Sequence, residues 1–285
     1  MSTRKREVVV GVDGSETSTA AALWAAGEAH ARGATLIVLY SFELYAYGSK
    51  DAALPGSMAY EQAQIAAAEL VDEVIEKIEH THHGLPVEPR ILHESAGTAL
   101  LEASAEALLT VVSSQGHSAR TEELIGSFAV HTAEHGRGPV AVVRGGASAP
   151  AGPIVVGTDG SAVSQDAIEY GFEAAAAHQV PLHVVHCGSG EDVNGADEAR
   201  EPADLEGMLT DRRNRFADVE VIPAFVPGKP QEALRGYAAR QGASQLVVGA
   251  RGVSGFAGIV LGSVSRSLLA NSEIPVVVVR PQDPS

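Results

Sequence analysis

The segment Gln245–Leu269 reads QLVVGARGVSGFAGIVLGSVSRSLL, and its order of residue types organises the interpretation of the whole chain. It begins with the apolar run Leu246–Val248, passes through a glycine-rich loop, and closes with Gly262-Ser263 before an apolar pattern of helical spacing. A buried strand, a glycine loop and a helix N-terminus in this order form an anion site, because loop N–H groups can turn inward and the helix start adds unpaired donors. The segment therefore predicts phosphate binding, with a simple strand–helix connection as the alternative.

Composition limits the kind of protein that this chain can be. It has 285 residues, 45% of them hydrophobic, which favours two globular domains. The net charge of −16 argues against nucleic acid or an anionic membrane as the partner. The single cysteine, Cys187, excludes an internal disulfide and fits a reducing compartment. Because there is neither a leader pattern nor an apolar run of the ~18 residues that a membrane span needs, we expect a cytoplasmic protein.

A long internal repeat divides the chain. The phrase GVDGS at Gly11–Ser15 returns 146 residues later as GTDGS at Gly157–Ser161. This period is too long for a solenoid repeat and indicates a duplicated domain. We expect domains at residues 1–146 and 154–285, joined by a linker at 147–153 that is rich in Gly, Ala and Pro.

Apolar runs and helical patterns alternate in both halves. The clearest expected strands are Glu7–Val12, Thr35–Ser41, Val87–Leu92, Leu108–Val112, Pro139–Arg144, Leu182–Cys187, Val219–Phe225, Gln245–Val248 and Pro275–Arg280. The expected helices are Thr17–Arg32, Ser57–His80, Gly97–Ala107, Ser127–His135, Val163–His178, Asp204–Arg215, Pro230–Gln241 and Ser263–Asn271. This alternation predicts parallel sheets covered on both faces. With strand order 3-2-1-4-5, the Asp after the first strand and the loop after the fourth face one crevice, where doubly wound sheets bind ligands.

These motifs, in this order, resemble the universal stress protein family. The family's nucleotide motif is Gly, two residues, Gly, nine residues, Gly, then Ser or Thr, and Gly249, Gly252 and Gly262-Ser263 match it in full. The resemblance covers nearly the whole chain as two copies in tandem. It implies an α/β protein of two doubly wound five-stranded parallel-sheet domains, flavodoxin-like or adenine-nucleotide-hydrolase-like, in a family of which many members bind ATP.

The resemblance also implies roles for residues of the second half. Asp159, next to Thr158, is expected against the adenosine, although Asp-Gly is also a common turn. The main chain at His186 and Cys187 is expected at the adenine edge. The residues expected around the phosphates are Gly249, Gly252, Gly262, Ser263, Val264 and Ser265, with Arg251, and further along Arg266, as cations that help if they point inward. Mg²⁺ is a possible companion of the ATP.

The first half departs from the motif. Ser113 stands where the first glycine is expected, and Phe128-Ala129 stands where the second half has Val264-Ser265. The loop also gains Glu122-Glu123, whose charges would repel a triphosphate. We therefore predict that the second half binds ATP and that the first binds it weakly or not at all. The weaker candidates of the first half are Asp13, Gly116, Gly126 and Ser127.

The function expected from the sequence is that of an ATP-binding regulatory protein of the general stress response. A nucleotide-free scaffold that works by dimerisation, or a slow ATP hydrolase, is the alternative, since no P-loop or catalytic constellation is visible. The apolar fifth strands need covering, which predicts pairing of the two halves, a homodimer, or both, beside a protein partner of unknown identity. The residues His80, His82 and His83 are interpreted as a helix end, with a metal site as the lesser alternative.

Overall fold

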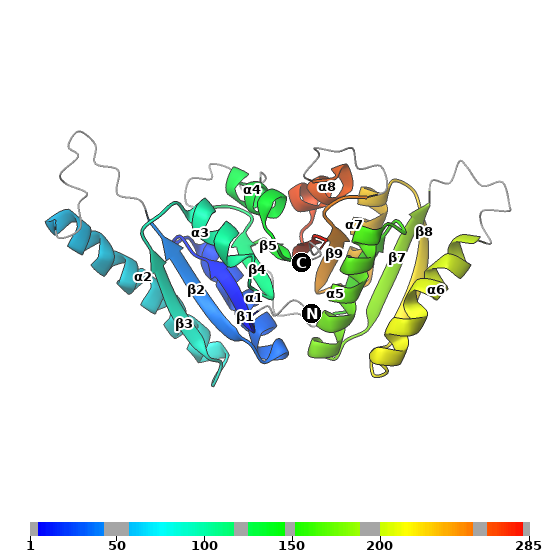
Figure 1. Ribbon diagram of the computed structural model, residues 1–285, viewed down its shortest axis with the longest axis horizontal. Helices are drawn as coiled ribbons and strands as arrows, with labels where there is room; N and C mark the ends of the chain where they lie inside the picture. The colour runs from blue at the N-terminus through cyan, green and yellow to red at the C-terminus, as the bar shows by residue number, and fades with distance from the viewer. Residues whose placement is uncertain are drawn as a thin grey trace.

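The protein is an α/β structure built around a single sheet (Figure 1), in a computed structural model that describes residues 5–42, 57–116, 125–145, 152–188, 200–252 and 261–281. The strands are β1 (Glu7–Gly11), β2 (Thr35–Ser41), β3 (Val87–Leu92), β4 (Leu109–Ser113), β5 (Val140–Val143), β6 (Ile154–Thr158), β7 (Leu182–Gly188), β8 (Val221–Pro227), β9 (Gln245–Gly249) and β10 (Val276–Val279). The helices are α1 (Glu16–Arg32), α2 (Met58–Thr81), α3 (Ala96–Ala103), α4 (Ser127–His135), α5 (Ala162–His178), α6 (Arg200–Arg215), α7 (Pro230–Arg240) and α8 (Ser263–Asn271). Their order along the chain confirms the alternation expected from the sequence.

The two halves join edge to edge in one ten-stranded sheet, with the order β3-β2-β1-β4-β5-β10-β9-β6-β7-β8. Each half has the expected order 3-2-1-4-5, and its own strands are parallel. The junction is antiparallel: Val142 of β5 lies opposite Val276 of β10, and Val140 opposite Val278. Pairing of the two fifth strands within the chain is therefore confirmed, and it covers the apolar edges that each half exposes alone.

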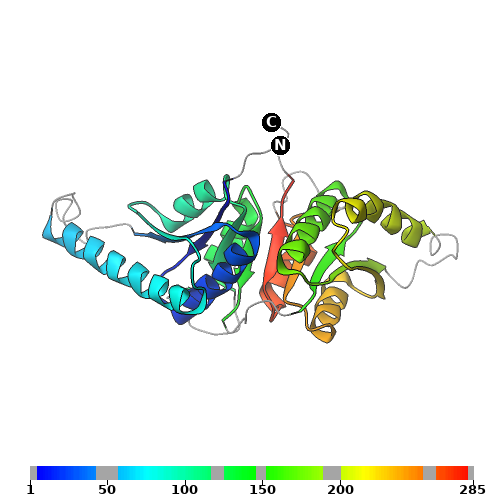
Figure 2. The same cartoon turned by 90° about the horizontal axis from the view of Figure 1, so that it is seen from below.

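Apolar side chains fill both faces of the sheet, which explains why the strands are rich in valine. Along β1, Val8 and Val10 belong to the core under α1, α2, α5 and α6, whereas Val9 belongs to the core under α3, α4, α7 and α8. Figures 1 and 2 show the helices arranged over the two faces in this way. Each core contains residues of both halves, so the hydrophobic interior continues across the junction.

A buried polar cluster lies at the junction between α1 and α5. The fully buried carboxylate of Glu28 contacts the Arg32 Nε at 3.1 Å, His178 Nε2 at 2.8 Å and Gln245 Nε2 at 3.0 Å. The Arg32 guanidinium also lies over the Tyr170 ring, 4.8 Å from its centroid. Burial alone would raise the pKa of Glu28, but the charge of Arg32 and the hydrogen bond from His178 outweigh it and lower that pKa. The cluster thus links the halves through a paired, buried charge.

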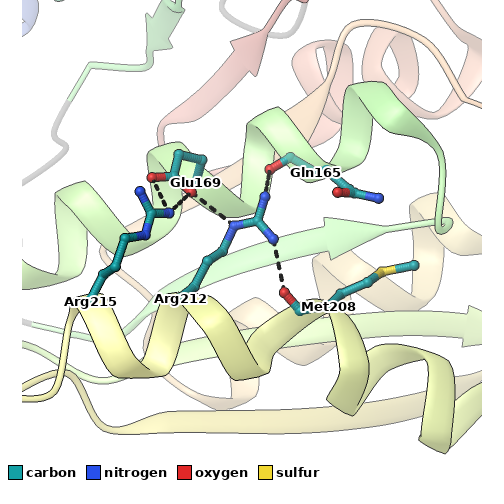
Figure 3. A network of polar contacts seen from close by, with 5 residues as sticks. All are labelled: Gln165, Glu169, Met208, Arg212 and Arg215. Atoms are coloured by element: carbon teal, nitrogen blue, oxygen red, sulfur yellow. Dashed lines mark hydrogen bonds and ion pairs between the residues drawn. The ribbon is translucent and has the colours of Figure 1, made fainter.

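The segments between the second and third strands depart most from the sequence interpretation. Helix α6 begins at Arg200, four residues before the expected Asp204. Its last turns are tied to α5, because Glu169 contacts Arg212 at 2.9 Å and Arg215 at 2.5 Å (Figure 3). On α2 the apolar Ile65 side chain is 59% exposed, since the first turns of the helix project past the sheet (Figure 1).

Candidate functional site

The turn after the first strand has the same construction in both halves. In the second half, Asp159 Oδ1 accepts a hydrogen bond from the N–H of Ser161 at 3.0 Å. In the first half, Asp13 Oδ1 accepts one from the N–H of Ser15 at 3.0 Å. In each turn a glycine of positive φ lies between the aspartate and the serine, with φ 78° at Gly160 in the second half, a conformation that residues with a side chain rarely adopt. One oxygen of each carboxylate therefore stabilises the Asp-Gly turn, which is the alternative role of these aspartates.

The other carboxylate oxygen of Asp159 lies against the glycine loop. A Cβ placed on Gly252 would be 2.4 Å from Asp159 Oδ2, closer than real Cβ atoms approach. In the first half, a Cβ on Gly116 would be 3.0 Å from Asp13 Oδ2. The structure thus brings the aspartate after the first strand and the loop after the fourth strand together, as the strand order predicts. A larger residue at position 252 would have to displace the Asp159 carboxylate.

The first glycine of the loop is packed tightly. A Cβ on Gly249 would lie 3.0 Å from Val163 Cγ1 and 3.2 Å from the Arg251 carbonyl oxygen. The Gly249 carbonyl accepts a hydrogen bond from Ser265 Oγ at 2.7 Å. Ser265 is only 3% exposed, so in this structure its hydroxyl holds the loop against α8. The sequence predicted that Ser265 lies near the phosphates and did not predict this hydrogen bond to the Gly249 carbonyl.

Helix α8 begins without a side-chain cap. Its N-cap residue is Gly262, which has no side chain to accept a hydrogen bond, whereas α5 begins at Ser161, whose hydroxyl accepts from the N–H of Ser164. The Gly262 N–H itself donates to the Ala250 carbonyl at 2.8 Å. Among the described residues, no side chain caps the first-turn N–H groups, from Ser263 onward, which are donors without an intrahelical acceptor. Together with the positive end of the helix dipole, they suit an anion.

The remaining candidates border the carboxyl end of β7. Thr158 is buried, and its hydroxyl lies 3.0 Å from Ser164 Oγ and accepts from the Gly160 N–H at 3.2 Å, so its side chain serves the turn. His186 pairs with Thr158 in the sheet register. Cys187 follows it, and burial raises the pKa of this thiol to about 11, which makes it unreactive at neutral pH. These three residues lie around one strand end, where the Thr158 hydroxyl is already used by the turn.

The two arginines near the loop have different surroundings. Arg251 is exposed beside Gly252. Arg266 instead pairs with Glu134 of α4, with 2.6 Å between Arg266 Nη2 and Glu134 Oε1. Of these two arginines, Arg266 is therefore engaged with α4, whereas Arg251 is exposed at the start of the loop.

Within the described ranges, no three His, Cys, Asp or Glu side chains are grouped so as to hold a metal ion. His80 and His82 lie at the end of α2, as the helix-end interpretation predicts. Among the helices that the structure describes, none is long and apolar enough to cross a membrane.

Sequence comparison places the geometry in a known family. The model of the universal stress protein family matches residues 5–144 and, a second time, residues 151–280. The chain belongs to the universal stress protein family. Its two halves are thus two universal stress protein domains, each with the aspartate–glycine contact described above.

Relatives of the same architecture are found among bacteria and archaea. A universal stress protein of Mycolicibacterium smegmatis is 31% identical over 295 residues, covering 96% of this chain and 97% of its own. One of Mycobacterium tuberculosis is 31% identical over 312 residues, covering 98% and 96%. The crystal structure of a universal stress protein from Archaeoglobus fulgidus superposes with a TM-score of 0.74 at 22% identity, covering 97% of this chain and 98% of its own, which supports the fold. A shorter universal stress protein, solved in complex with cAMP, is 31% identical over 45% of this chain and 94% of its own, with a TM-score of 0.38.

The first universal stress protein domain keeps the frame but fills its loop differently. Ser113 Oγ and Thr17 Oγ1 both donate to the Gln115 carbonyl, at 2.5 and 3.0 Å. In the second domain the matching positions are Gly249 and Val163, which offer no hydroxyl. The start of the first-domain loop is therefore held at the Gln115 carbonyl by two hydroxyls. Glu122 and Glu123, expected to repel phosphate, lie outside the described residues.

Other first-domain candidates retain their places. Gly126 is the N-cap of α4 without a side-chain cap, and Ser127 is exposed at the first helical position. Phe128, one residue further, is 39% exposed at the helix start, and Ala129 is buried. The helix start thus has the uncapped backbone of α8 but lacks the hydroxyl that Ser265 provides.

An aromatic cluster at the strand ends of the first domain was missed by the sequence reasoning. His93 Nε2 lies 3.1 Å from Tyr60 Oη and 3.2 Å from Gln64 Nε2, and the Phe42 ring contacts the His93 ring edge-on, with centroids 4.5 Å apart. Phe42 follows β2 and His93 follows β3, so a register argument could have placed them together. In the second domain the corresponding residues are Gly188 and Pro227, the last residues of β7 and β8, so the aromatic cluster is not repeated there.

Proposed function

We propose that the protein binds ATP in its second domain and acts as an ATP-dependent regulator in the stress response. The observation that carries the proposal is the contact between Asp159 and Gly252 at the switch point of the sheet. A carboxylate there can accept hydrogen bonds from ribose hydroxyls, while the glycine lets the loop backbone approach an oxyanion. The family membership and the match to the family's nucleotide motif support the same ligand.

The phosphates are assigned to the start of α8. Its first-turn N–H groups have no side-chain cap, and Ser263 adds an exposed hydroxyl at the first helical position. Arg251 is the cation at the loop. We assign the adenine edge to the main chain at His186 and Cys187. The neighbouring Thr158 hydroxyl is not assigned to the base, because the turn already uses it. Ser265 holds the start of the loop through its hydrogen bond to the Gly249 carbonyl.

ATP would arrive with Mg²⁺ on its phosphates, and the described residues supply no dedicated metal ligand set. We therefore propose that any Mg²⁺ is held by the phosphates and water. Binding, and not hydrolysis, is the proposed activity, because the loop has no base, lysine or acid in catalytic arrangement. Titration with and without EDTA tests the metal requirement.

The scaffold alternative loses one of its supports in this structure. We had expected the fifth strands to need a partner, and β5 and β10 cover each other within one chain. A homodimer would therefore need another surface. Native mass spectrometry of the purified chain measures both its oligomeric state and any nucleotide that it retains.

The test of the proposal is a matched pair of glycine substitutions in the full chain. Among the described residues, a Cβ on Gly262 has no neighbour closer than 3.5 Å, and one on Gly126 none closer than 3.4 Å, so neither helix start has a described contact that excludes a small side chain. Gly262→Val places its side chain where phosphate is expected, and should weaken ATP binding at least tenfold, or about 1.4 kcal/mol. Gly126→Val should leave it unchanged.

Isothermal titration of both variants with ATP, and with cAMP as the competing ligand, measures this difference. Equal loss in the two variants would place nucleotide in both domains. Unchanged affinity in Gly262→Val would remove this loop as the site. Tighter binding of cAMP than of ATP would redirect the proposal to a cyclic nucleotide.

A further inference from the structure

Helix α8, which carries the proposed phosphate site, contacts the first domain at two positions. Near its start, Arg266 pairs with Glu134 of α4 at 2.6 Å, and the Arg266 N–H closes the first turn on the Gly262 carbonyl at 3.0 Å. At its end, the Ala270 carbonyl accepts a hydrogen bond from the guanidinium of Arg144, just after β5. Figure 1 shows α4 and α8 next to each other above the junction. The two contacts are made by the fourth and the eighth of the nine residues of α8.

The contact at the helix end is reciprocal. Arg280, which follows β10, is the repeat counterpart of Arg144 and donates to the carbonyl of Ala133, at 2.9 Å, and to that of Glu134. Each domain's last strand thus holds the end of the other domain's helix. A cation at a helix C-terminus is favourable in both cases, so this exchange is explained as stabilisation of the junction.

The ion pair near the start of α8 has no counterpart. In α4 the position that matches Arg266 is Val130, and in α8 the position that matches Glu134 is Ala270. The corresponding contact would be apolar. The ion pair therefore joins α8 to α4 at one place only, because the matching positions, Val130 and Ala270, cannot form an ion pair.

A second link runs from the loop itself. The Ala250 N–H donates to the Val279 carbonyl at 2.7 Å, which sets the next residue of each strand, Arg251 and Arg280, close together. Burial and the charge of Arg251 lower the pKa of Arg280, while Glu134 opposes this. An anion that pairs with Arg251 would therefore relieve repulsion on the arginine that holds α4.

We propose that the first domain regulates nucleotide binding in the second, because Glu134 on α4 holds α8 in the position from which its first turn binds phosphate. The inference rests on the proposed function, since it concerns the same site. Fixing a binding element in advance raises affinity by lowering the ordering cost of binding. By linkage, nucleotide in the second domain must then stabilise the position of α4 to the same extent.

Simple electrostatics predicts the opposite sign, which makes the inference testable. Glu134 is a negative charge near a proposed site for a highly charged anion. Its removal should strengthen ATP binding if charge alone matters, and should weaken binding if its contact with Arg266 holds the helix. The pair is partly exposed, 60% at Arg266 and 19% at Glu134, so an effect of a few-fold is expected.

The experiment is ATP titration of the full chain with Glu134→Gln, at low and moderate salt. We expect affinity to fall about threefold. Glu102→Gln is the matched control, because it removes a charge from the neighbouring helix α3 without a contact to α8, and it should leave the affinity unchanged. An unchanged or higher affinity in Glu134→Gln overturns the inference. A wild-type chain that binds no ATP overturns the proposed function instead.

Hydrogen exchange supplies a second readout that a purely local role would not move. ATP should slow amide exchange in α4, in the other domain, in the wild-type chain, and should slow it much less in Glu134→Gln. ATP binding without any protection of α4 would contradict the coupling, whatever the affinity of the variant.

Discussion

The crevices of the two domains share their backbone and differ in their side chains. Both place an aspartate oxygen against a loop glycine, at Asp13–Gly116 and Asp159–Gly252, and both follow the loop with a helix that begins at an uncapped glycine. The second domain adds Ser265, which holds its loop. The frame is therefore set by sheet topology and close packing, which duplication preserves, whereas ligand binding depends on a few positions that can change without loss of fold.

The hydroxyl groups show how this change occurs. In the first domain, Thr17 and Ser113 donate to a loop carbonyl, and Ala129 stands where the second domain has a serine. In the second domain, the hydroxyl comes from the helix, at Ser265, and the strand end is Gly249. In both domains a carbonyl at the start of the loop accepts from hydroxyls, but these come from α1 and β4 in the first domain and from α8 in the second. Only the second arrangement leaves the strand end without a side chain.

The domains also contribute unequally to their junction. Glu28 of α1 has Ala174 as its counterpart in α5, and Arg32 has His178. The buried carboxylate therefore comes from the first domain alone, while the second supplies a histidine and an amide. The junction is as asymmetric as the crevices, which suggests that the two copies have specialised together.

The largest expected effect tests this junction. Glu28→Gln leaves the buried Arg32 guanidinium without its carboxylate, and should lower the free energy of unfolding by about 3 kcal/mol. Urea unfolding at pH 7 measures it. Because the folded pKa of Glu28 is lowered, its stabilisation is full above the ordinary glutamate pKa of about 4.3 and is lost as pH falls below that value. The variant should lack this acid-dependent component.

The control for this prediction is Glu73→Gln, which removes one partner of the exposed Glu73–Lys77 pair on α2. It should leave unfolding unchanged. If Glu28→Gln behaved like this surface variant, the junction cluster would contribute no net stability, and the domains would be held by apolar packing alone.

The next effect compares the two aspartate–glycine contacts. Gly252→Ala puts a methyl group 2.4 Å from Asp159 Oδ2 and must displace the carboxylate, so ATP affinity should fall at least about tenfold. Gly116→Ala meets Asp13 Oδ2 at 3.0 Å and should not change ATP binding. Calorimetric titration of the two variants decides the matter. A similar loss in both would show that the crevices are functionally equal.

A smaller effect is expected from the loop hydroxyl. Ser265→Ala copies Ala129 of the first domain and removes the hydrogen bond to the Gly249 carbonyl, which should cost about 1 kcal/mol of stability and weaken ATP binding a few-fold. The reverse change, Ala129→Ser, should not create a site, because Ser113 still occupies the strand end. Nucleotide titration of Ala129→Ser that revealed a second bound ATP would contradict this account.

The fold could be predicted from the sequence because its signals are local. Apolar runs and helical spacing predicted most strands and helices, and the repeated Asp-Gly turn predicted the duplication, whereas the strand order agrees with the family resemblance. The backbone arrangement of the candidate site could be predicted, since Asp159 and Gly252 meet as expected. The pairing of Arg266 with Glu134 could not, because the two residues are 132 positions apart in the chain. The exposed Ile65 could not be foreseen either, since helical spacing does not reveal where the sheet ends.

The smallest effect uses a thiol that only the second domain has. Cys187 lies at the end of β7, and the corresponding residue of β2 is Ser41, so alkylation reports on one crevice alone. Since its pKa is raised to about 11, the rate of modification by iodoacetamide should be low at pH 7 and should rise about tenfold per pH unit toward pH 10. Saturating ATP should slow it a further two- to threefold, if the adenine edge lies at this strand end. A rate that ignores ATP, in a chain shown to bind it, would move the base away from β7 while leaving the phosphate assignment at α8 intact.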